Sequence, residues 1–355
     1  MATWLKDTIL PEDSIEKDFS TLYETQLVLA TTLVSSHQLS DACELLHAVE
    51  KAARVGNDLK TLKAVIVSIL TFCITEKAWK ILTEQITFLA KRRGQKSAAI
   101  TVIVQSVQVV LKDIVDEALE MEIIAALRII SDGKIYVEKE RAMLTQRLST
   151  IKERQGDISA AAEILQEVHV ETYGAMTALE KCEFILEQVR LTLEKKDYIR
   201  AFILSKKIQR RLLDDVAFSS CKLKFYKLMM IYHEHENDTV ELSCDWKAIF
   251  DTPVVQAEDG VWKEALEHAV LFAVLSAHDQ RQHDLLCRLA LEKSLEKVPS
   301  FAALMKLFTT LEVIAYPLGM QDVIQSHPIM KTVDRGEQWM KDLHTRVIEH
   351  VRILM

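Results

Sequence analysis

Glycine and proline are scarce in this sequence. Among 355 residues there are 8 glycines and 5 prolines, and no proline lies between Pro11 and Pro253. Proline breaks helix interiors and glycine weakens them, so this gap predicts about twelve helices joined by short turns. Strand signals, meaning period-two alternation between Asn-Gly or Asp-Gly turns, are missing apart from Asp132-Gly133. The sequence therefore predicts an all-α fold.

Cysteine pairs and long apolar runs are missing too. The 6 cysteines form no C-x-x-C pair, which is typical of a reduced compartment. The first residues lack the basic and apolar regions of a secretion signal. The most apolar segments, 64–74 and 98–111, fall short of the roughly 20 apolar residues that a bilayer requires. We expect a soluble protein of the cytoplasm and nucleus, with no membrane partner. Its net charge of −8 disfavours general nucleic-acid binding.

The stretch 155–174 carries the clearest local signal. Gly156 is predicted to end one helix and Asp157 to cap the next, which runs through the stretch as one helix of a hairpin. Small side chains beside an apolar stripe let a neighbouring helix approach closely. The residues that define this unit are Gly156, Asp157, Ala161, Leu165, Tyr173 and Gly174.

The same helix-capping Asp recurs along the chain. Asp197 and Asp238 follow Asp157 at steps of 40 and 41 residues, and small or apolar residues stand four and eleven places after each Asp. Near position 118 the repeat fails, because Glu122 falls where a small or apolar residue is expected. A period of about 40 residues made of two helices is typical of an α-solenoid. Nearer the N-terminus, Gln38 and Ala78 occupy the place of the Asp. The fourth-place residues are Ala42, Leu82, Ala161, Ala201 and Leu242, and the eleventh-place residues are Val49, Leu89, Val168, Ile208 and Ile249.

The main predicted boundary lies at Asp251-Thr252-Pro253, where proline interrupts the helical pattern. Residues 1–253 are predicted to form a helical-repeat arm and residues 254–355 a second helical region. The predicted helices cover residues 14–34, 38–54, 58–74, 77–91, 135–154, 155–174, 181–193, 198–213, 221–235, 239–250, 261–276, 281–291 and 301–314, with two more before residue 130 and a last one from about 334.

No catalytic, cofactor-binding or metal-binding pattern is assigned. The cluster 233–236 has the sequence His-Glu-His-Glu, but its position before Asn237-Asp238 favours a solvated loop over a metal site. The dipeptides His278-Asp279 and His283-Asp284 resemble the ligands of a metal-dependent phosphohydrolase fold, with His268 available upstream. That fold also needs a downstream Asp on a core helix, which is missing, so an exposed polar turn is favoured.

Two basic clusters are candidates for partner contacts. One is Lys91-Arg92-Arg93 with Lys96. The other consists of Lys206, Lys207, Arg210 and Arg211, which are predicted to share one helical face. Clustered cations can follow phosphates, so an RNA-binding solenoid is an alternative function. Because no aromatic residues are interleaved for base stacking, a solvated face or an acidic partner protein is favoured.

Several longer motifs resemble a known family. I-Y-V-E-K-E-R-A at 135–142, L-Q-E-V-H-V-E-T-Y-G at 165–174, F-I-L-E-Q-V-R-L at 184–191, I-F-D-T-P at 249–253 and L-M-K-L-F-T-T-L-E at 304–312 are similar to the family of 26S proteasome non-ATPase regulatory subunit 12. The resemblance runs from about residue 60 to the end of the sequence. Members of this family are PCI-domain subunits in the lid of the 19S regulatory particle.

The resemblance implies a non-catalytic scaffold that supports lid assembly and ubiquitin-dependent degradation. It implies contacts with other lid subunits, including the deubiquitinating metalloprotease subunit, with the ATPase ring and with the outer ring of the core particle. Residues 254–355 would be the helical part of a PCI domain whose winged helix is absent, so we expect defective assembly. The paralogous PCI subunit of the cullin-deneddylating signalosome remains the alternative within this class.

Overall fold

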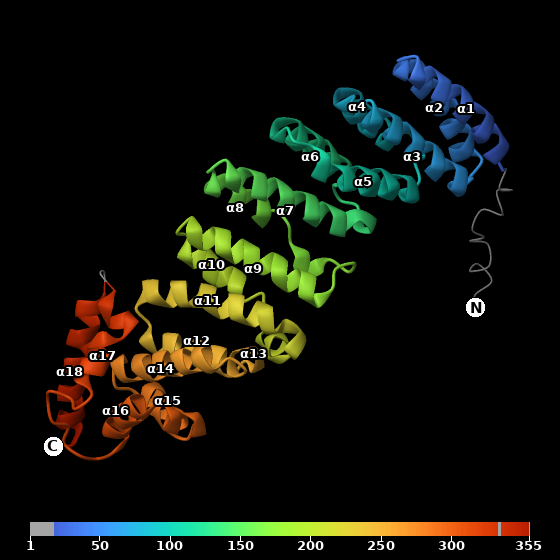
Figure 1. Cartoon of the computed structure of the whole chain (residues 1–355). Coiled ribbons are helices and arrows are strands. Elements are labelled where there is room, and N and C mark those ends of the chain that lie inside the picture. The colour runs from blue at the N-terminus through green and yellow to red at the C-terminus, as the bar shows by residue number, and fades with distance from the viewer. Residues whose placement is uncertain (1–17, 333–334, 355) are drawn as a thin grey trace, which may run out of the picture. The chain divides into compact units, whose positions relative to one another are not determined.

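The structure is a computed structural model that describes residues 18–332 and 335–354. Those residues form eighteen α-helices and seven short 3-10 helices, and no strand occurs among them (Figure 1). The all-α prediction is therefore confirmed. The chain divides into two compact units, Met1–Thr177 (unit 1) and Ala178–Met355 (unit 2). The predicted starts of the first helix at Ser14 and of the last at Asp334 lie outside the described residues.

Unit 1 is a series of helical hairpins in which each helix packs mainly on the next one or two helices along the chain (Figure 1). This nearest-neighbour packing is the arrangement expected of a solenoid. Its α-helices are α1 (Ser20–Ser35), α2 (Leu39–Val55), α3 (Leu59–Thr75), α4 (Trp79–Ala90), α5 (Ser97–Val110), α6 (Glu117–Ser131), α7 (Glu138–Arg154) and α8 (Ile158–Gln166). The 3-10 helices are η1 (Leu111–Asp113), η2 (Ile135–Val137) and η3 (Val170–Thr172).

One backbone geometry joins most of these helices. A residue with positive φ ends the helix, as Asn57 does at 60° and Gly156 at 83°. The next amide N–H then donates to a carbonyl five residues back, from Asp58 to Ala53 at 2.9 Å and from Asp157 to Lys152 at 3.0 Å. These bonds satisfy carbonyls that the helix end would otherwise leave unpaired. Gly156 therefore ends α7 as predicted.

The predicted helix caps are present in both units. The Asp157 carboxylate accepts from the Ala160 N–H at 2.9 Å, and Asp197 accepts from Arg200 N–H at 3.1 Å. Asp238 caps its own helix in the same way, by accepting from Glu241 N–H at 3.1 Å. The repeated Asp therefore marks the first residue before a helix, which is the position that favours a short acceptor side chain.

The residues predicted at the fourth and eleventh places of the repeat are buried. Each is at most 6% exposed, so the period identified core positions in the second half of each hairpin. These residues are Ala42, Leu82, Ala161, Ala201, Leu242, Val49, Leu89, Val168, Ile208 and Ile249.

The predicted break in the repeat near position 118 is a shift in phase. Asp116 caps α6 by accepting from Ala118 N–H at 3.0 Å, two residues before the expected place. The fourth place therefore falls on Glu120, and Glu122 is exposed. Glu120 is buried and forms an ion pair with Arg147, which also donates to the Leu111 carbonyl at 2.8 Å. An ion pair thus replaces the usual apolar contact.

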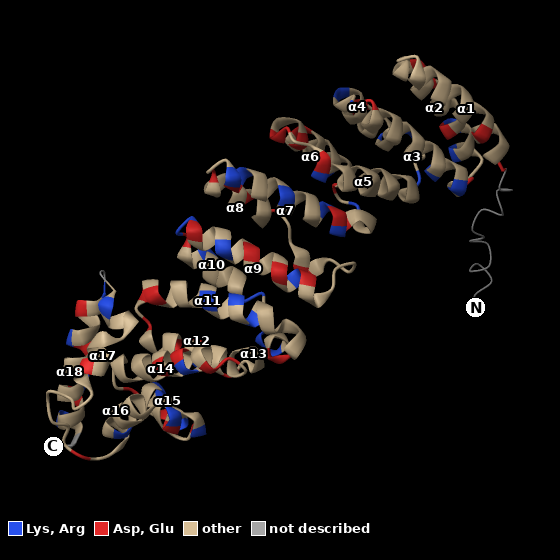
Figure 2. Cartoon of the chain, in the orientation of Figure 1, with Lys and Arg blue, Asp and Glu red and all other residues tan. Residues whose placement is uncertain are grey.

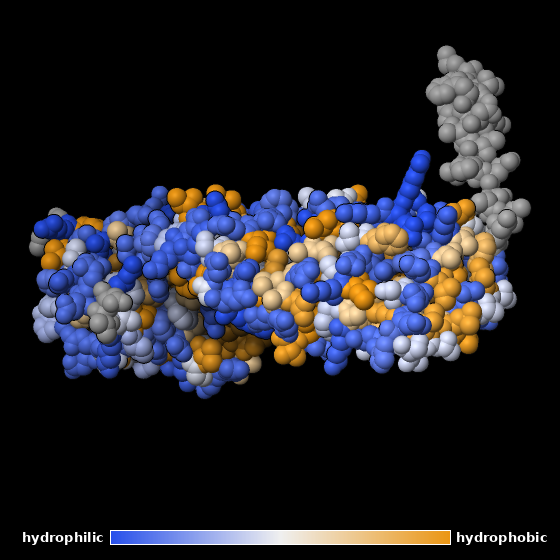
Figure 3. Space-filling view, turned by 90° about the horizontal axis from the view of Figure 1, so that it is seen from above, coloured by the Kyte–Doolittle hydropathy of each residue, from blue (hydrophilic) through white to orange (hydrophobic). Residues whose placement is uncertain are grey.

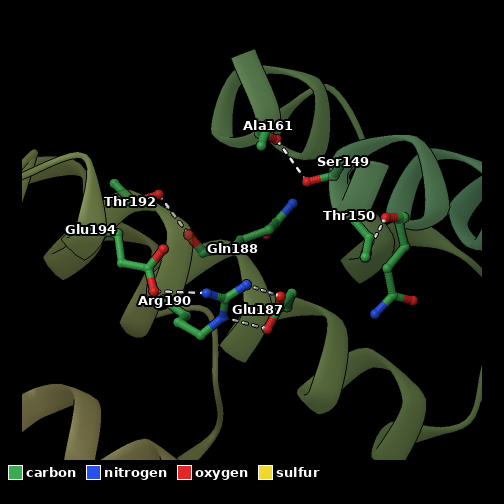
Figure 4. A network of polar contacts seen from close by, with 9 residues as sticks. Ser149, Thr150, Ala161, Glu187, Gln188, Arg190, Thr192 and Glu194 are labelled. Carbon is green, nitrogen blue, oxygen red and sulfur yellow. Dashed lines mark hydrogen bonds and ion pairs between the residues drawn. The ribbon is translucent and has the colours of Figure 1, made fainter. Parts of the chain in front are cut away.

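The helix predicted across residues 155–174 is shorter than expected. α8 ends at Gln166, and η3 follows. Val168 and Val170 are both buried, at 2% and 0% exposure. A spacing of two residues would place them about 200° apart on an α-helix. Both can be buried only if the backbone leaves the α-helical conformation. On the other side of the hairpin, Ser149 of α7 donates to the Ala161 carbonyl at 2.9 Å and ties α7 to α8 (Figure 4).

Unit 2 begins with further hairpins and continues into helices around one buried helix, α14. Its α-helices are α9 (Ala178–Glu194), α10 (Tyr198–Ser205), α11 (Ser219–Glu236), α12 (Thr239–Phe250), α13 (Pro253–Gln256), α14 (Asp259–Leu275), α15 (Gln280–Ala290), α16 (Pro299–Thr309), α17 (Gln321–Ser326) and α18 (Gly336–Leu354). The 3-10 helices are η4 (Arg210–Asp214), η5 (Val216–Phe218), η6 (Lys293–Lys297) and η7 (Pro328–Lys331).

The core of unit 2 surrounds α14, which packs against α12, α13, α15, α16 and α18. Every residue from His268 to Leu275 is buried, so the second half of α14 is covered on all sides. A helix that is apolar all round needs such an enclosure. The ring of Phe272 lies edge-on to Trp339 of α18, with centroids 5.2 Å apart.

Two predictions in this unit need correction. The helix predicted to reach residue 314 ends at Thr309, and the stretch between 314 and 334, for which no helix was predicted, contains α17. Polar side chains on α9 pair within the helix: Arg190 lies between Glu187 and Glu194, at 2.5 Å and 2.7 Å (Figure 4). Such pairs support an exposed helix face.

The predicted boundary at residue 253 stays a prediction. Pro253 occupies the first position of α13, where its missing N–H costs no hydrogen bond. The division between compact units, at residues 177 and 178, falls elsewhere.

Apolar side chains reach the surface in several separate places (Figure 3). Among the described residues, each helix is too short or too polar to span a lipid bilayer.

Candidate interaction site

The four cations proposed for partner contact lie in the turn after α10. α10 ends at Ser205, so Lys206 and Lys207 follow the helix, and Arg210 and Arg211 begin η4. Lys206, Arg210 and Arg211 are exposed, while Lys207 is half-buried. Between the two pairs of cations the chain turns inward and buries Ile208 at 6% exposure. We call these four residues the α10 basic turn.

The prediction that these cations share one helical face is wrong. A continued helix would place Lys206 beside Arg210 and Lys207 beside Arg211, and like charges at this spacing destabilise a helix. The helix ends instead, which separates the two pairs. The predicted helix 198–213 is therefore α10 followed by η4.

Aromatic side chains accompany the α10 basic turn, contrary to the sequence-based expectation. The Lys206 ammonium lies 4.4 Å from the centroid of the Phe202 ring. Phe202 stacks on Tyr232 of α11 with centroids 5.0 Å apart, and Tyr198 stacks on His235 at 3.6 Å. The signal that was missed is the spacing of four residues between Phe202 and Lys206, which places them one turn apart on a helix.

More cations lie on α11 beside this turn. Lys224 and Lys227 are exposed, and the α11 ribbon carries blue segments in Figure 2. Lys222 is buried and pairs with Asp214 at 3.4 Å. The surface therefore combines exposed cations with half-buried aromatic rings. Such a surface suits a partner that offers carboxylates and apolar side chains.

The cluster 233–236 is the last turn of α11 and not a loop. Its first residue, His233, is buried at 5% exposure, and its Nδ1 lies 2.7 Å from the Asp245 carboxylate of α12. Burial raises the pKa of Asp245, although the contact with His233 opposes that shift. His233 thus fastens α11 to α12, whereas His235 is exposed.

The two His-Asp dipeptides lie between α14 and α15 and at the start of α15. Asp279 caps α15 by accepting from Gln282 N–H at 2.6 Å, and Asp284 pairs with Arg288 at 2.7 Å. His268 is buried in α14, where it stacks on Trp246 with centroids 4.2 Å apart. Among the described residues no group of three or more His, Cys, Asp or Glu side chains is arranged to hold a metal ion.

The remaining repeat-defining residues, Leu165, Tyr173 and Gly174, differ in how deeply they are buried. Leu165 is fully buried, and Tyr173 is half-buried, which raises the pKa of its hydroxyl. Gly174 is exposed, and a Cβ added there would meet no other atom. Four of the cysteines, Cys43, Cys73, Cys182 and Cys221, are buried as free thiols, in keeping with a role as small apolar residues.

Comparison with known proteins decides the family. A family model described as PSMD12/CSN4, N-terminal, matches residues 41–258. The chain belongs to the PSMD12/CSN4 family. The matched region begins within α2, covers the rest of unit 1 and continues into unit 2 as far as the start of α14.

Individual relatives of this family match nearly the whole chain. The 26S proteasome non-ATPase regulatory subunit 12 of Dictyostelium discoideum is 35% identical over 97% of this chain and 77% of its own length. Homolog B of that subunit in Arabidopsis thaliana is 36% identical, over 89% and 77% of the two chains. The 26S proteasome regulatory subunit RPN5 of Saccharomyces cerevisiae is 33% identical, over 94% and 76%. The resemblance to this family seen in the sequence is thus confirmed.

Proposed function

We propose that this chain is a scaffold subunit in the lid of the 26S proteasome regulatory particle, where it supports lid assembly and ubiquitin-dependent degradation. The observation that carries this proposal is the similarity to proteasome regulatory subunits over 89% to 97% of the chain. Those relatives carry proteasome names and not signalosome names, so the paralogous signalosome subunit is the less favoured assignment.

We also propose that the chain acts without chemistry of its own. The carboxylates that a phosphohydrolase would need for metal binding are engaged elsewhere, Asp279 as a helix cap and Asp284 in an ion pair. A series of hairpins instead exposes many side chains over a long surface, which suits binding to several proteins. The partners proposed are other lid subunits, among them the deubiquitinating metalloprotease subunit, together with the ATPase ring and the outer ring of the core particle. The proposed location is the cytoplasm and nucleus.

The test is affinity capture of the tagged chain from an extract of its own cells, followed by mass spectrometry. We expect lid subunits, with ATPase and core-particle subunits at lower yield. Recovery of signalosome subunits alone would transfer the chain to the paralogous complex. Recovery of neither complex would refute the proposed function.

A charge-reversed variant sharpens the same test for the α10 basic turn. Replacing Lys206, Lys207, Arg210 and Arg211 by Glu is expected to reduce recovery of at least one partner subunit. The matched control reverses four exposed cations elsewhere, Lys60, Lys80, Lys112 and Lys341. If the two variants recover the same subunits in the same amounts, the α10 basic turn does not contact a partner. RNA recovered by the original chain, and lost only from the first variant, would favour the RNA-binding alternative.

A further inference from the structure

The second basic cluster borders a groove on unit 1. The groove lies along the last two turns of α4 and the turn that follows, and its volume is about 680 Å³. Phe88 lies in it with 45% of its surface exposed, which is high for a large aromatic side chain. We call it the α4 groove. Its lining residues are Thr83, Glu84, Thr87, Phe88, Lys91, Arg92 and Arg93.

The turn after α4 is held in place by a hydrogen-bond network around a buried carboxylate. Glu50 of α2 is 0% exposed and accepts from Arg54 Nε at 3.0 Å and from Gln95 Nε2 at 3.2 Å. Arg54 also donates to the Arg93 carbonyl at 2.5 Å, and Gln95 donates to the Leu89 carbonyl at 2.9 Å. Burying a carboxylate is costly unless it is paired, so this network is specific to one arrangement of the turn. The cations on the turn are therefore presented by a fixed backbone.

The polar groups that remain available in the α4 groove are nearly all positive. The hydroxyls of Thr83 and Thr87 donate to carbonyls of their own helix, at 3.1 Å each, so they offer mainly methyl groups. Among the described residues, Lys91, Arg92 and Arg93 form no ion pair. Three cations thus face one acid, Glu84, in a chain whose net charge is −8. Such local excess of one sign selects a partner of the opposite sign.

Phe88 is partly covered by its neighbours and keeps part of its ring open for an apolar contact. The Arg92 guanidinium lies 3.9 Å from the ring centroid and covers one face, while His47 of α2 approaches with ring centroids 4.8 Å apart. A nucleotide base would need a free ring face for stacking. An aliphatic or aromatic side chain needs only the exposed part of the ring and the threonine methyl groups. The ring therefore favours a protein partner over a nucleic acid.

We propose that the α4 groove binds a short acidic segment of a partner protein that inserts one apolar side chain beside Phe88. Carboxylates flanking that side chain would pair with Lys91, Arg92 and Arg93, and charge complementarity is the ground for choosing this occupant. Because Arg92 already stacks on Phe88, its side chain loses little conformational entropy when the acidic segment binds. The inference goes beyond the assembly proposed above and does not depend on it.

The test measures fluorescence anisotropy of labelled peptides titrated with the purified full chain. The probe is a short peptide with a central Phe flanked on both sides by Asp and Glu. One control peptide replaces the central Phe by Ala, and the other replaces the acids by Asn and Gln. We expect the acidic Phe peptide to bind about tenfold more tightly than either control, and its affinity to fall as salt rises.

Variants locate the binding on the chain. Arg93→Glu and Phe88→Ala are each expected to weaken binding about tenfold or more, whereas Lys112→Glu, the same charge change at an exposed residue of η1, should change it less than about twofold. Circular dichroism confirms that each variant is folded. A second charge reversal, Lys91→Glu, provides the same readout if Phe88→Ala does not fold.

The inference is overturned by any of three results. The acidic Phe peptide fails to bind, or it binds equally well to Arg93→Glu and to the original chain, or a single-stranded oligouridine binds more tightly than the peptide and depends on the same residues. Each of these results is independent of whether proteasome subunits are captured, so the proposed function and the α4 groove can fail separately.

Discussion

In unit 1 the buried residues are divided among successive helices, whereas in unit 2 many of them lie on α14. The helices α2, α3 and α14 each have 17 residues, but α14 buries eleven of them while α2 and α3 bury seven each. α2 and α3 keep one face in solvent and contact their neighbours along the chain. α14 contacts helices that come before and after it in the sequence.

This difference predicts how far local unfolding caused by a mutation should extend in each unit. Repeats that contact only their neighbours can open one at a time, since each buries its apolar face against the adjacent repeats. Helices that share one central helix lose a common partner when that helix is damaged. We therefore expect local unfolding in unit 1 and cooperative unfolding in the part of unit 2 that surrounds α14.

The largest expected effect comes from matched cavities in the two units. Leu70 of α3 and Leu266 of α14 are both 0% exposed. Each Leu→Ala change should cost about 2 to 5 kcal/mol, with Leu266→Ala at the upper end because α14 is enclosed and cannot collapse into the cavity. Hydrogen exchange measures the spread. Leu70→Ala should speed exchange in α3 and in the helices that pack on it, α1, α2, α4 and α5, and leave α6 to α8 unchanged. Leu266→Ala should speed exchange in every helix that packs on α14. Equal spread from the two changes would contradict the comparison.

A smaller effect, confined to unit 2, depends on pH. His327 is buried at 7% exposure, 3.6 Å from the Glu267 carboxylate and edge-on to His268. Burial lowers the pKa of His327 to about 4, and the neighbouring His268 adds to this effect. Between about pH 6.5 and 4 the unfolded chain binds a proton that the folded chain does not, so stability falls as the pH falls through this window and then levels off. The loss is at most about 3 kcal/mol.

Chemical denaturation at a series of pH values checks this expectation. His327→Gln should flatten the dependence between pH 6.5 and 4, while His278→Gln, at an exposed position, should leave it unchanged. The pKa of His268 is also lowered by burial and contributes in the same direction, whereas the raised pKa of Glu267 contributes in the opposite one. A slope that survives in His327→Gln would assign the effect to other groups.

The smallest expected effect tests the turns of unit 1. Lys77 has a φ of 54°, a conformation that glycine adopts without steric cost. Lys77→Gly should therefore stabilise the chain by about 0.5 to 1 kcal/mol. Lys80→Gly, three residues later inside α4, should destabilise it by about 1 kcal/mol because glycine is a poor helix former. Thermal unfolding of the two variants measures both changes in stability. A change of the same sign in both variants would show that the turn at Lys77 is not under strain.

Sequence patterns that depend on neighbours in the chain were predictable. The caps at Asp157, Asp197 and Asp238 and the core positions that follow them are set within one hairpin, so spacing alone identifies them. The helix ends after Gln166 and Ser205 were missed because burial of later residues, such as Val170 and Ile208, draws the chain out of the helix. That pull comes from tertiary packing, which local propensity does not contain.

The interaction surfaces were predicted only in part. Clusters of Lys and Arg are visible in the sequence, but whether they share a face depends on where a helix ends, as at Lys206. The Glu50 network joins residues about 40 positions apart, and no local pattern links Glu50 to Gln95. His233 was assigned to solvent because its partner, Asp245, lies on the next helix. Contacts between helices are the information that one sequence lacks.

The left-handed turns have a consequence for how such chains can change in length. In unit 1 His37, Asn57 and Lys77 adopt this geometry at steps of 20 residues, although their side chains have nothing in common. The first three helix connections of unit 1 therefore follow the same backbone path, whatever their sequence. A whole hairpin of about 40 residues could be duplicated or deleted during evolution without breaking a helix or inventing a new connection.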